Sequence, residues 1–185
     1  LHHDLPETDI TSNDISEEEA RIMGFFFGDG SCGVYNCISG KKCSWALNNS
    51  SMEIIKQYQN LCKKVYNELD WNILDTISSS GVYKLVPNCN KKYGKLVEFI
   101  NIYRNKSYHK NCKIIPEIIM HSNKNIREAF WDGLYDADGD KSIYNRIDQK
   151  NQISSAYINW LACSLGYRTS INTRRDKKDI YRITL

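Results

Sequence analysis

Two aspartates, each followed directly by glycine, end two similar stretches of sequence about 110 residues apart. The first stretch is 22–30, with Asp29 before its last glycine, and the second is 131–139, with Asp138 in the same place. Both stretches have helical spacing, so each acid is expected in the last turn of a helix, where the helix dipole disfavours a carboxylate by about 0.3–1 kcal/mol. A hard divalent cation with oxygen ligands is the natural counterion for two such acids. An ion held there could activate water for phosphodiester hydrolysis.

Small residues four positions apart predict that these two helices pack against each other. Gly24 and Gly28 fall on one face of the first helix, and Gly133 and Ala137 fall on one face of the second. Faces of this kind let two backbones approach closely. We therefore expect a parallel helix pair with these four residues at its interface, and we expect the last glycine of each motif to end its helix in the left-handed conformation.

The rest of the chain predicts the same order of elements twice. After an extended leader at 1–14, a first half at 15–103 should run helix, two strands, helix, two strands, helix. A polar stretch at 104–112 is interpreted as a linker. A second half at 113–185 repeats the order without a counterpart of the closing helix. The expected fold class is α+β, with two pseudo-symmetric αββαββ(α) halves joined through the motif helices, each carrying an antiparallel sheet.

Composition is that of an ordinary globular protein, with 41% hydrophobic and 25% charged residues. No apolar run approaches the ~20 residues of a membrane span, so no membrane partner is expected. Seven cysteines without a CxxC pair argue against a zinc or disulfide framework and favour a reducing, intracellular setting. Net charge is only +3, but residues 168–182 gather six basic groups against two acidic ones. Such a local basic surface can follow a phosphate backbone.

The paired motifs resemble those of the LAGLIDADG homing endonucleases in their single-chain, two-motif form. Tail segments at 164–167, 170–174 and 179–185 also resemble endonuclease domains of inteins in viral or archaeal-type DNA polymerases. The resemblance covers the chain from about residue 15 to the end. It implies a mobile-element enzyme that acts as a pseudo-dimeric monomer on double-stranded DNA, without an obligate protein partner. It also implies an asymmetric target and a staggered break with 3′ overhangs.

The resemblance assigns the metal site to Asp29 and Asp138, assisted by the backbone carbonyls of Gly28 and Ala137. The implied cofactor is Mg²⁺ or Mn²⁺, and Ca²⁺ is expected to bind without supporting cleavage. The repeat selects the same two acids, because Asp136 and other acids of the second motif have no acidic counterpart in the first.

Three further patterns need an interpretation. The family often has a lysine near the fourth strand of the first half, and among the lysines of 91–95 we take Lys92 as the catalytic one, with a solvated charge as the alternative. The phenylalanines at 25–27 are interpreted as core rather than as a platform for bases. A calcium loop over 136–147 is excluded, because Lys141 stands where its turn glycine is needed and Ile147 where its closing glutamate belongs.

Polar and basic side chains of the predicted strands are the candidate DNA contacts, because ribbons of strand fit the major groove. Alternate residues of a strand face the core, so about half of such a set can touch DNA. Lys41, Lys42 and Lys178 are expected to meet phosphate. The candidates are Ser31, Tyr35, Asn36, Lys41, Lys42, Ser44, Trp45, Asp75, Ser78, Tyr83, Lys84, Arg146, Asp148, Gln149, Lys150, Arg168, Ser170, Asn172, Arg174, Arg175 and Lys178.

Three functions fit these features. The first is a site-specific, metal-dependent DNA endonuclease. The second is a maturase that binds intron RNA, and the third is a DNA-binding module, such as a decayed intein domain, that no longer cleaves. Retention of both Asp29 and Asp138 favours the nuclease, because a protein that only binds has no use for two mutually repelling acids.

Overall fold

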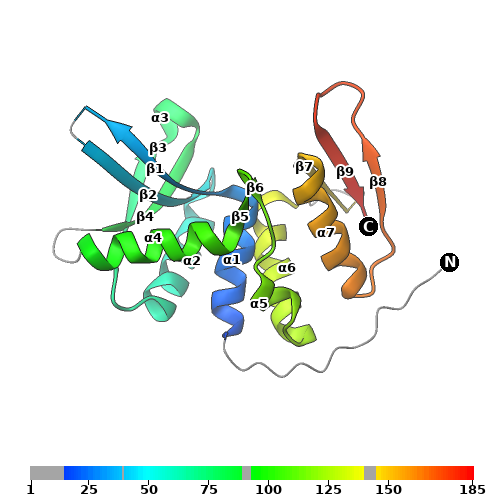
Figure 1. Ribbon diagram of the computed structural model, residues 1–185, viewed down its shortest axis with the longest axis horizontal. Helices are drawn as coiled ribbons and strands as arrows, with labels where there is room; N and C mark the ends of the chain where they lie inside the picture. The colour runs from blue at the N-terminus through cyan, green and yellow to red at the C-terminus, as the bar shows by residue number, and fades with distance from the viewer. Residues whose placement is uncertain (1–14, 39, 89–92, 140–144) are drawn as a thin grey trace.

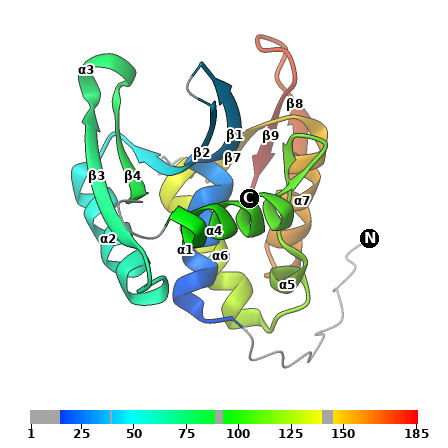
Figure 2. The same cartoon turned by 60° about the vertical axis from the view of Figure 1, so that its left-hand side comes forward.

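Two helices, α1 (Glu17–Asp29) and α6 (Lys124–Asp138), lie side by side at the centre of the computed structural model (Figure 1). The structure describes residues 15–38, 40–88, 93–139 and 145–185. The two helices run parallel and end next to each other, between a sheet from the first half and a sheet from the second (Figures 1 and 2). This arrangement confirms the predicted α+β class with a central pair of motif helices.

Side-chain caps fix where both central helices begin. Ser16 accepts a hydrogen bond from the backbone N–H of Glu19 at 3.1 Å, and Asn123 accepts one from Ile126 at 3.1 Å. Each cap satisfies a backbone donor that the first helical turn leaves without a partner. Neither helix has a basic residue in its last turn. The negative end of each helix dipole therefore receives no compensation from its own helix.

The first half forms an antiparallel sheet whose buried face packs against helices. Trp45, Leu47 and Leu85 are at most 1% exposed and point toward α2 and α4. In spatial order the strands are β1 (Gly30–Cys37), β2 (Gly40–Asn49), β4 (Val82–Asn88) and β3 (Asp70–Thr76). The short helix α3 (Ile77–Ser80) connects β3 to β4. Helices α2 (Met52–Val65) and α4 (Tyr93–Ser107) lie on the buried face.

The described residues of the second half form a three-stranded antiparallel sheet. Ile147 and Ile183 are fully buried, stand opposite each other in register, and face α7. The opposite face of this sheet points away from the core. In spatial order its described strands are β7 (Arg146–Lys150), β9 (Ile180–Thr184) and β8 (Ser170–Thr173), and its helix is α7 (Gln152–Ser164).

The segment predicted as a linker at 104–112 is structured, so that prediction was wrong. Helix α4 continues to Ser107, because Tyr103 and Ser107 are buried on its inner side. A small hairpin of β5 (Tyr108–His109) and β6 (Cys112–Lys113) follows, and a short helix α5 (Glu117–Met120) leads to α6. Two residues with positive φ, at 110 and 111, make the hairpin turn. The connection thereby becomes a fixed support beside the ends of the central helices.

An aromatic cluster forms the core of the first half. Phe26 stacks on Trp45 with ring centroids 5.5 Å apart, and Tyr103 and Phe99 pack edge-on around Trp45. Because Phe25 is also fully buried, the core interpretation of the phenylalanine run is confirmed. Within the described part of the chain, no helix has both the length and the apolar character that crossing a membrane requires.

Candidate active site

At Gly24 and Gly133 the interface between α1 and α6 has no room for a side chain. A Cβ added to Gly24 would lie 1.9 Å from the carbonyl oxygen of Phe130, and one added to Gly133 would lie 2.0 Å from that of Arg21. Both distances are far below any real contact, so the two backbones touch directly. The predicted helix interface at Gly24 and Gly133 is therefore in the structure.

The same interface brings the two acids of the motifs together at its upper end. A Cβ on Gly28 would lie 2.6 Å from Ala137 Cβ and 3.1 Å from Asp138 Oδ2. The carboxylate of Asp138 thus lies against the last turn of α1, next to Asp29. Repulsion from Asp138 also acts on the Asp29 carboxyl.

The last glycine of each motif is needed for a reason other than the predicted one. Gly30 has φ −83° and Gly139 has φ −66°, so both are extended and the expected left-handed ends are wrong. A Cβ on Gly30 would instead lie 2.3 Å from the ring of Phe26, and one on Gly139 would lie 2.5 Å from the ring of Tyr135. The chain must turn closely past an aromatic ring as it leaves each helix, and only glycine fits there.

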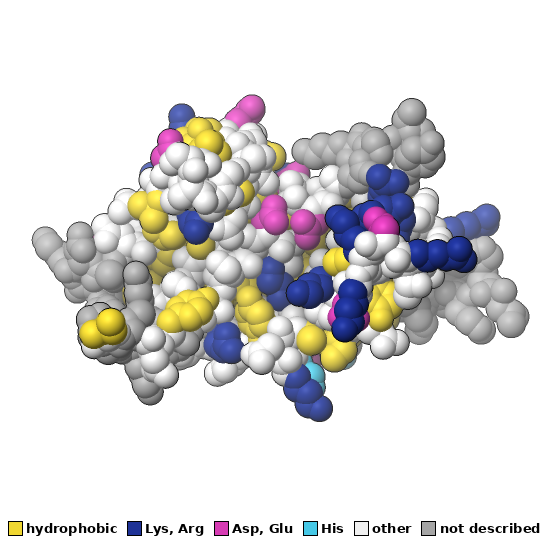
Figure 3. Space-filling model, turned by 90° about the horizontal axis from the view of Figure 1, so that it is seen from above, with side chains coloured by type: hydrophobic (Ala, Val, Ile, Leu, Met, Phe, Trp, Pro, Cys, Tyr) yellow, Lys and Arg dark blue, Asp and Glu magenta, His cyan; other side chains and the backbone are white. Residues whose placement is uncertain are grey.

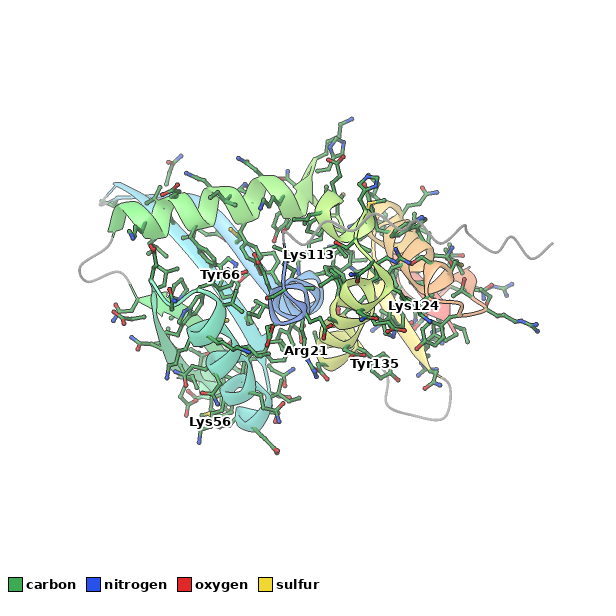
Figure 4. The ribbon with its side chains drawn as sticks, turned by 90° about the horizontal axis from the view of Figure 1, so that it is seen from below. Arg21, Lys56, Tyr66, Lys113, Lys124 and Tyr135 are labelled. Atoms are coloured by element: carbon green, nitrogen blue, oxygen red, sulfur yellow. The ribbon has the colours of Figure 1, made fainter. Side chains whose placement is uncertain are left out.

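A lysine that the sequence did not point to reaches this site. Lys113, at the end of β6, donates from Nζ to the carbonyl oxygen of Gly28 at 2.8 Å and to that of Phe26 at 3.0 Å. Figure 4 shows Lys113 beside the end-on view of α1, on the side opposite Arg21. Its ammonium group supplies the positive charge that the last turn of α1 lacks. Both motif acids also attract it.

Burial shifts the pKa of all three groups, and repulsion from Asp138 adds to the shift of Asp29. Desolvation, followed by repulsion from Asp138, raises the pKa of Asp29 to about 6, although Lys113 opposes this shift. Desolvation also raises the pKa of Asp138 above its usual range, again opposed by Lys113. Desolvation lowers the pKa of Lys113 to about 8, against the attraction of the two carboxylates. When both carboxyl groups are ionised, their two negative charges exceed the single positive charge of Lys113.

Asn48 of β2 is a second contributor that sequence reasoning missed. Its side-chain Nδ2 donates to the backbone carbonyl oxygen of Asp29 at 2.7 Å, which ties the end of α1 to the sheet. The predicted catalytic lysine, Lys92, lies outside the described residues. The neighbouring Lys95 is in an exposed ion pair with Glu68. No signal in the sequence singled out Lys113, which directly follows the polar stretch that was interpreted as a linker.

The donor set suits a hard divalent cation. The carboxylates of Asp29 and Asp138 and the carbonyl oxygen of Gly28 lie close to the ammonium group of Lys113. The carbonyl oxygen accepts a hydrogen bond from Lys113 and has a second lone pair that could bind a metal. Among the described residues, no group of three or more His, Cys, Asp or Glu side chains could hold a metal. A cation at this site would therefore need backbone oxygens and further ligands in addition to Asp29 and Asp138.

Register places the first-sheet candidates on two different faces. Ser31, Tyr35 and Ser44 point away from the helices, and so does Lys84. Trp45 points into the aromatic cluster and is 1% exposed, so its prediction as a DNA contact was wrong. Tyr83 also packs on the core side of the sheet. Asn36 and Asp75 share that side but are exposed near the strand ends, and Ser78 is exposed in α3. The side chains of Lys41 and Lys42 lie outside the described part of the structure.

The second sheet presents most of its candidates on the outer face. Arg146, Asp148 and Lys150 alternate with the buried Ile147, whereas Gln149 falls on the helix side. Lys and Arg side chains gather over this half of the surface in the view from above (Figure 3). Ser170 and Asn172 of β8 share the outer face, and Arg168, Arg174, Arg175 and Lys178 lie before and after β8.

Solved structures of homing endonucleases match this fold. A mesophilic variant of the homing endonuclease I-DmoI matches with a TM-score of 0.67 and 21% identity, covering 91% of this chain and 87% of that one. I-DmoI in complex with DNA and Mn matches with a TM-score of 0.63, 20% identity and coverage of 91% and 88%. The LAGLIDADG homing endonuclease I-LtrWI bound to target DNA matches with a TM-score of 0.57, 17% identity and coverage of 91% and 78%. No protein-family model matches the chain.

These likenesses establish the class of fold. The chain has the two-motif fold of the LAGLIDADG homing endonucleases, a fold of DNA-binding nucleases, and the resemblance of its motifs is confirmed. In sequence it is 44% identical, over 193 aligned residues, to a DNA polymerase of Acanthamoeba polyphaga mimivirus. The alignment covers the whole chain but only 11% of the polymerase, as a segment inserted within a longer polymerase would.

Proposed function

We propose that this chain is a site-specific homing endonuclease that makes a staggered double-strand break in a long, asymmetric DNA target. One observation carries the proposal. Asp29 and Asp138, the acids that occur in both motifs, meet where two helix ends converge, and Lys113 reaches the same point. Structural needs alone do not explain two half-buried acids that repel each other, whereas phosphodiester hydrolysis does.

A divalent cation fits this arrangement. Asp29 and Asp138 would hold it, together with the backbone carbonyls of Gly28 and Ala137. When bound, Mg²⁺ or Mn²⁺ would lower the pKa of a water molecule and stabilise charge on the leaving oxygen.

The chain's own residues do the positioning. Asn48 fixes the end of α1, so that the carboxylate of Asp29 keeps its place while the substrate binds. Lys113 holds a positive charge next to the reacting phosphate, where it offsets the charge that develops in the transition state. The glycines of the interface let the two helix backbones touch, which keeps the ends of both helices, and with them the two acids, next to each other.

The outer faces of the two sheets are the proposed DNA-binding surface. Antiparallel strands fit the major groove, and one sheet on each side of the helix pair would follow one half-site each. Because the two halves differ in sequence, we expect the target to be asymmetric. A single chain supplies both halves, so we propose that the enzyme acts as a monomer.

The likeness to a segment of a viral DNA polymerase supports an intein context. We propose that the chain is the endonuclease domain of an element inserted in a DNA polymerase. Its target is then the polymerase coding sequence that lacks the insertion.

The test is cleavage of that uninterrupted sequence. The purified chain is incubated with a duplex spanning the joined flanks of the insertion, with Mg²⁺ or with EDTA, and the products are sized and their ends sequenced. We expect two fragments with 3′ overhangs in Mg²⁺ and intact duplex in EDTA. A matched duplex that retains the insertion should stay intact in both.

Two outcomes would contradict the proposal. Specific binding of the uninterrupted duplex without cleavage in Mg²⁺ or Mn²⁺ would identify a DNA-binding module instead. Preferential binding of the corresponding RNA would favour the maturase.

A further inference from the structure

An acidic residue lies on the outer face of the second sheet, where DNA is proposed to bind. Asp148 lies in β7 next to Arg182 of the central strand β9, and Asn172 of β8 completes the row in register. All three point away from Ile147 and Ile183, which face the core. A carboxylate on such a surface repels phosphate, so its presence needs a specific reason.

That reason is a network of two guanidinium groups around one carboxylate. Arg182 donates from Nε to Asp148 Oδ1 at 2.8 Å and from Nη2 to Asp148 Oδ2 at 2.9 Å. Arg174 donates from Nη1 to Asp148 Oδ2 at 2.8 Å, and its other edge pairs with Asp176. These bonds, led by those from Arg182, lower the pKa of Asp148 to about 2. The carboxylate therefore stays charged and keeps holding the arginines.

The network uses one edge of Arg182 and leaves another for a ligand. A guanidinium group has five N–H donors in a fixed plane. Asp148 occupies the edge made by Nε and Nη2, and neither of these two hydrogen bonds uses Nη1. With its plane fixed and its side chain 30% exposed, Arg182 is held ready for contact before DNA arrives.

Charge balance favours a base over a phosphate as the partner. Two arginines and two aspartates cancel, so the cluster attracts phosphate only weakly. Reading a base requires oriented donors rather than net charge. Guanine presents two acceptors, O6 and N7, to the paired donors of an arginine in the major groove.

We propose that Arg182 reads one guanine in the half-site under the second sheet, and that Asp148 is the residue that positions it. The inference rests on the proposed function, because it places DNA on this face. Arg182 lies outside the set that the sequence suggested, which holds Asp148 and Arg174 only as contacts in their own right.

The test is a binding selection from random sequences, which works without a defined target. A pool of duplexes with a randomised central segment is selected on wild-type protein and on Arg182→Ala, Arg182→Lys and Asp148→Asn, with Ca²⁺ in place of Mg²⁺. Lys178→Ala serves as the contrasting phosphate contact, and Lys124→Ala, at the far end of α6, serves as the control. Thermal melting confirms that each variant is folded.

We expect the wild-type protein to enrich a motif with guanine at one position that Arg182→Ala no longer selects, while the other positions are unchanged. The affinity of Arg182→Ala for the wild-type motif should fall about 5- to 150-fold, with an unchanged salt slope. Arg182→Lys and Asp148→Asn should relax the same position. Lys178→Ala should weaken all sequences alike and lower the salt slope by about one.

Two results would overturn the inference alone. One is an unchanged motif with Arg182→Ala, and the other is a uniform loss of affinity with a lower salt slope, which would make Arg182 a phosphate contact. A wild-type protein that enriches no motif would overturn the proposed function and this inference with it.

Discussion

The two sides of the central helix pair are related by the repeat, yet they carry opposite chemistry. The shift that superimposes the motifs takes Arg21 to Phe130 and Phe27 to Asp136. On one side Arg21 Nη2 donates to Asp136 Oδ2 at 2.8 Å, and the hydroxyl of Tyr58 donates to the same oxygen at 2.8 Å. On the other side the rings of Phe27 and Phe130 pack edge-on with centroids 6.1 Å apart.

This difference separates the parts that the two motifs share from the parts in which they differ. The small residues and the two end acids occur in both motifs, whereas the flanks differ. Two copies of α1 would face Arg21 with the ring of Phe27, and two copies of α6 would face Asp136 with that of Phe130. Each helix is therefore suited to the other and not to itself, as the asymmetry between the halves requires.

The largest expected effect comes from the interface that both sides share. Gly24→Ala and Gly133→Ala should each destabilise the protein by about 3 kcal/mol or more, because each Cβ would overlap a backbone carbonyl of the other helix. Denaturant unfolding measures this loss.

The matched control for these two variants is Gly94→Ala in α4, where an added Cβ would meet nothing within 4 Å. That change should leave stability the same or raise it by up to about 1 kcal/mol. A Gly24→Ala protein as stable as the Gly94→Ala protein would show that the helices do not pack as described.

Lys113 donates its hydrogen bonds to carbonyl oxygens of α1, the first of the two motif helices, and removing it sharpens the comparison. Lys113→Met should lower the cleavage rate about 100-fold, because the positive charge near the reacting phosphate is lost. The affinity of the protein–DNA complex for Ca²⁺ should rise, because one competing cation is gone. Lys95→Met, which removes only an exposed ion pair with Glu68, should change neither quantity. Equal cleavage by Lys113→Met and Lys95→Met would exclude this role.

The fold could be predicted from the sequence where local pattern and final packing agree. The small residues Gly24 and Gly133 predicted the helix interface that the structure has. The prediction of a linker at 104–112 was wrong because the segment is polar in composition, whereas its structure depends on packing against other parts of the protein. Nothing in the sequence marks Lys113 or the turn at 110–111. Their role becomes visible only in the structure, where the turn forms the hairpin and Lys113 contacts the end of α1.

The site was predictable in its acids and not in its supporting residues. Asp29 and Asp138 stand out because they occur twice, whereas Asn48 and Lys113 occur once and far away in sequence. The alternation of side chains along a strand predicted that some of the candidate DNA contacts face the core. Only the strand register and the burial in the structure showed that Trp45 is one of them.

The electrostatics of Asp29 predict an unusual pH dependence of stability without metal. Its folded pKa of about 6 lies above the ordinary value of 3.8, so the stability that it contributes is present below pH 4 and is lost as pH rises through 6. In EDTA, Asp29→Asn should therefore match the wild-type protein near pH 4 and exceed it by on the order of 2 kcal/mol at pH 7. Chemical denaturation at both pH values measures the difference. A variant less stable than wild type at pH 7 would contradict the described repulsion.

The smallest effect should distinguish the two flanks directly. Double-mutant cycles for Arg21 with Asp136 and for Phe27 with Phe130 should each give a coupling of about 1 kcal/mol. Only the first should weaken when the salt concentration rises, because Arg21 and Asp136 are 41% and 27% exposed and are screened. Salt-independent coupling on both sides would remove the contrast.

The most direct test of the shared catalytic site compares single-acid variants on the uninterrupted polymerase duplex in Mg²⁺. Asp29→Asn and Asp138→Asn should each bind the duplex like wild type and cleave it at least about 1000-fold more slowly, since the charge stabilisation that they organise is worth several kcal/mol. Asp132→Asn, an exposed acid of the second motif alone, should cleave normally. Normal cleavage by Asp29→Asn or Asp138→Asn would contradict the claim that the two acids form one catalytic site.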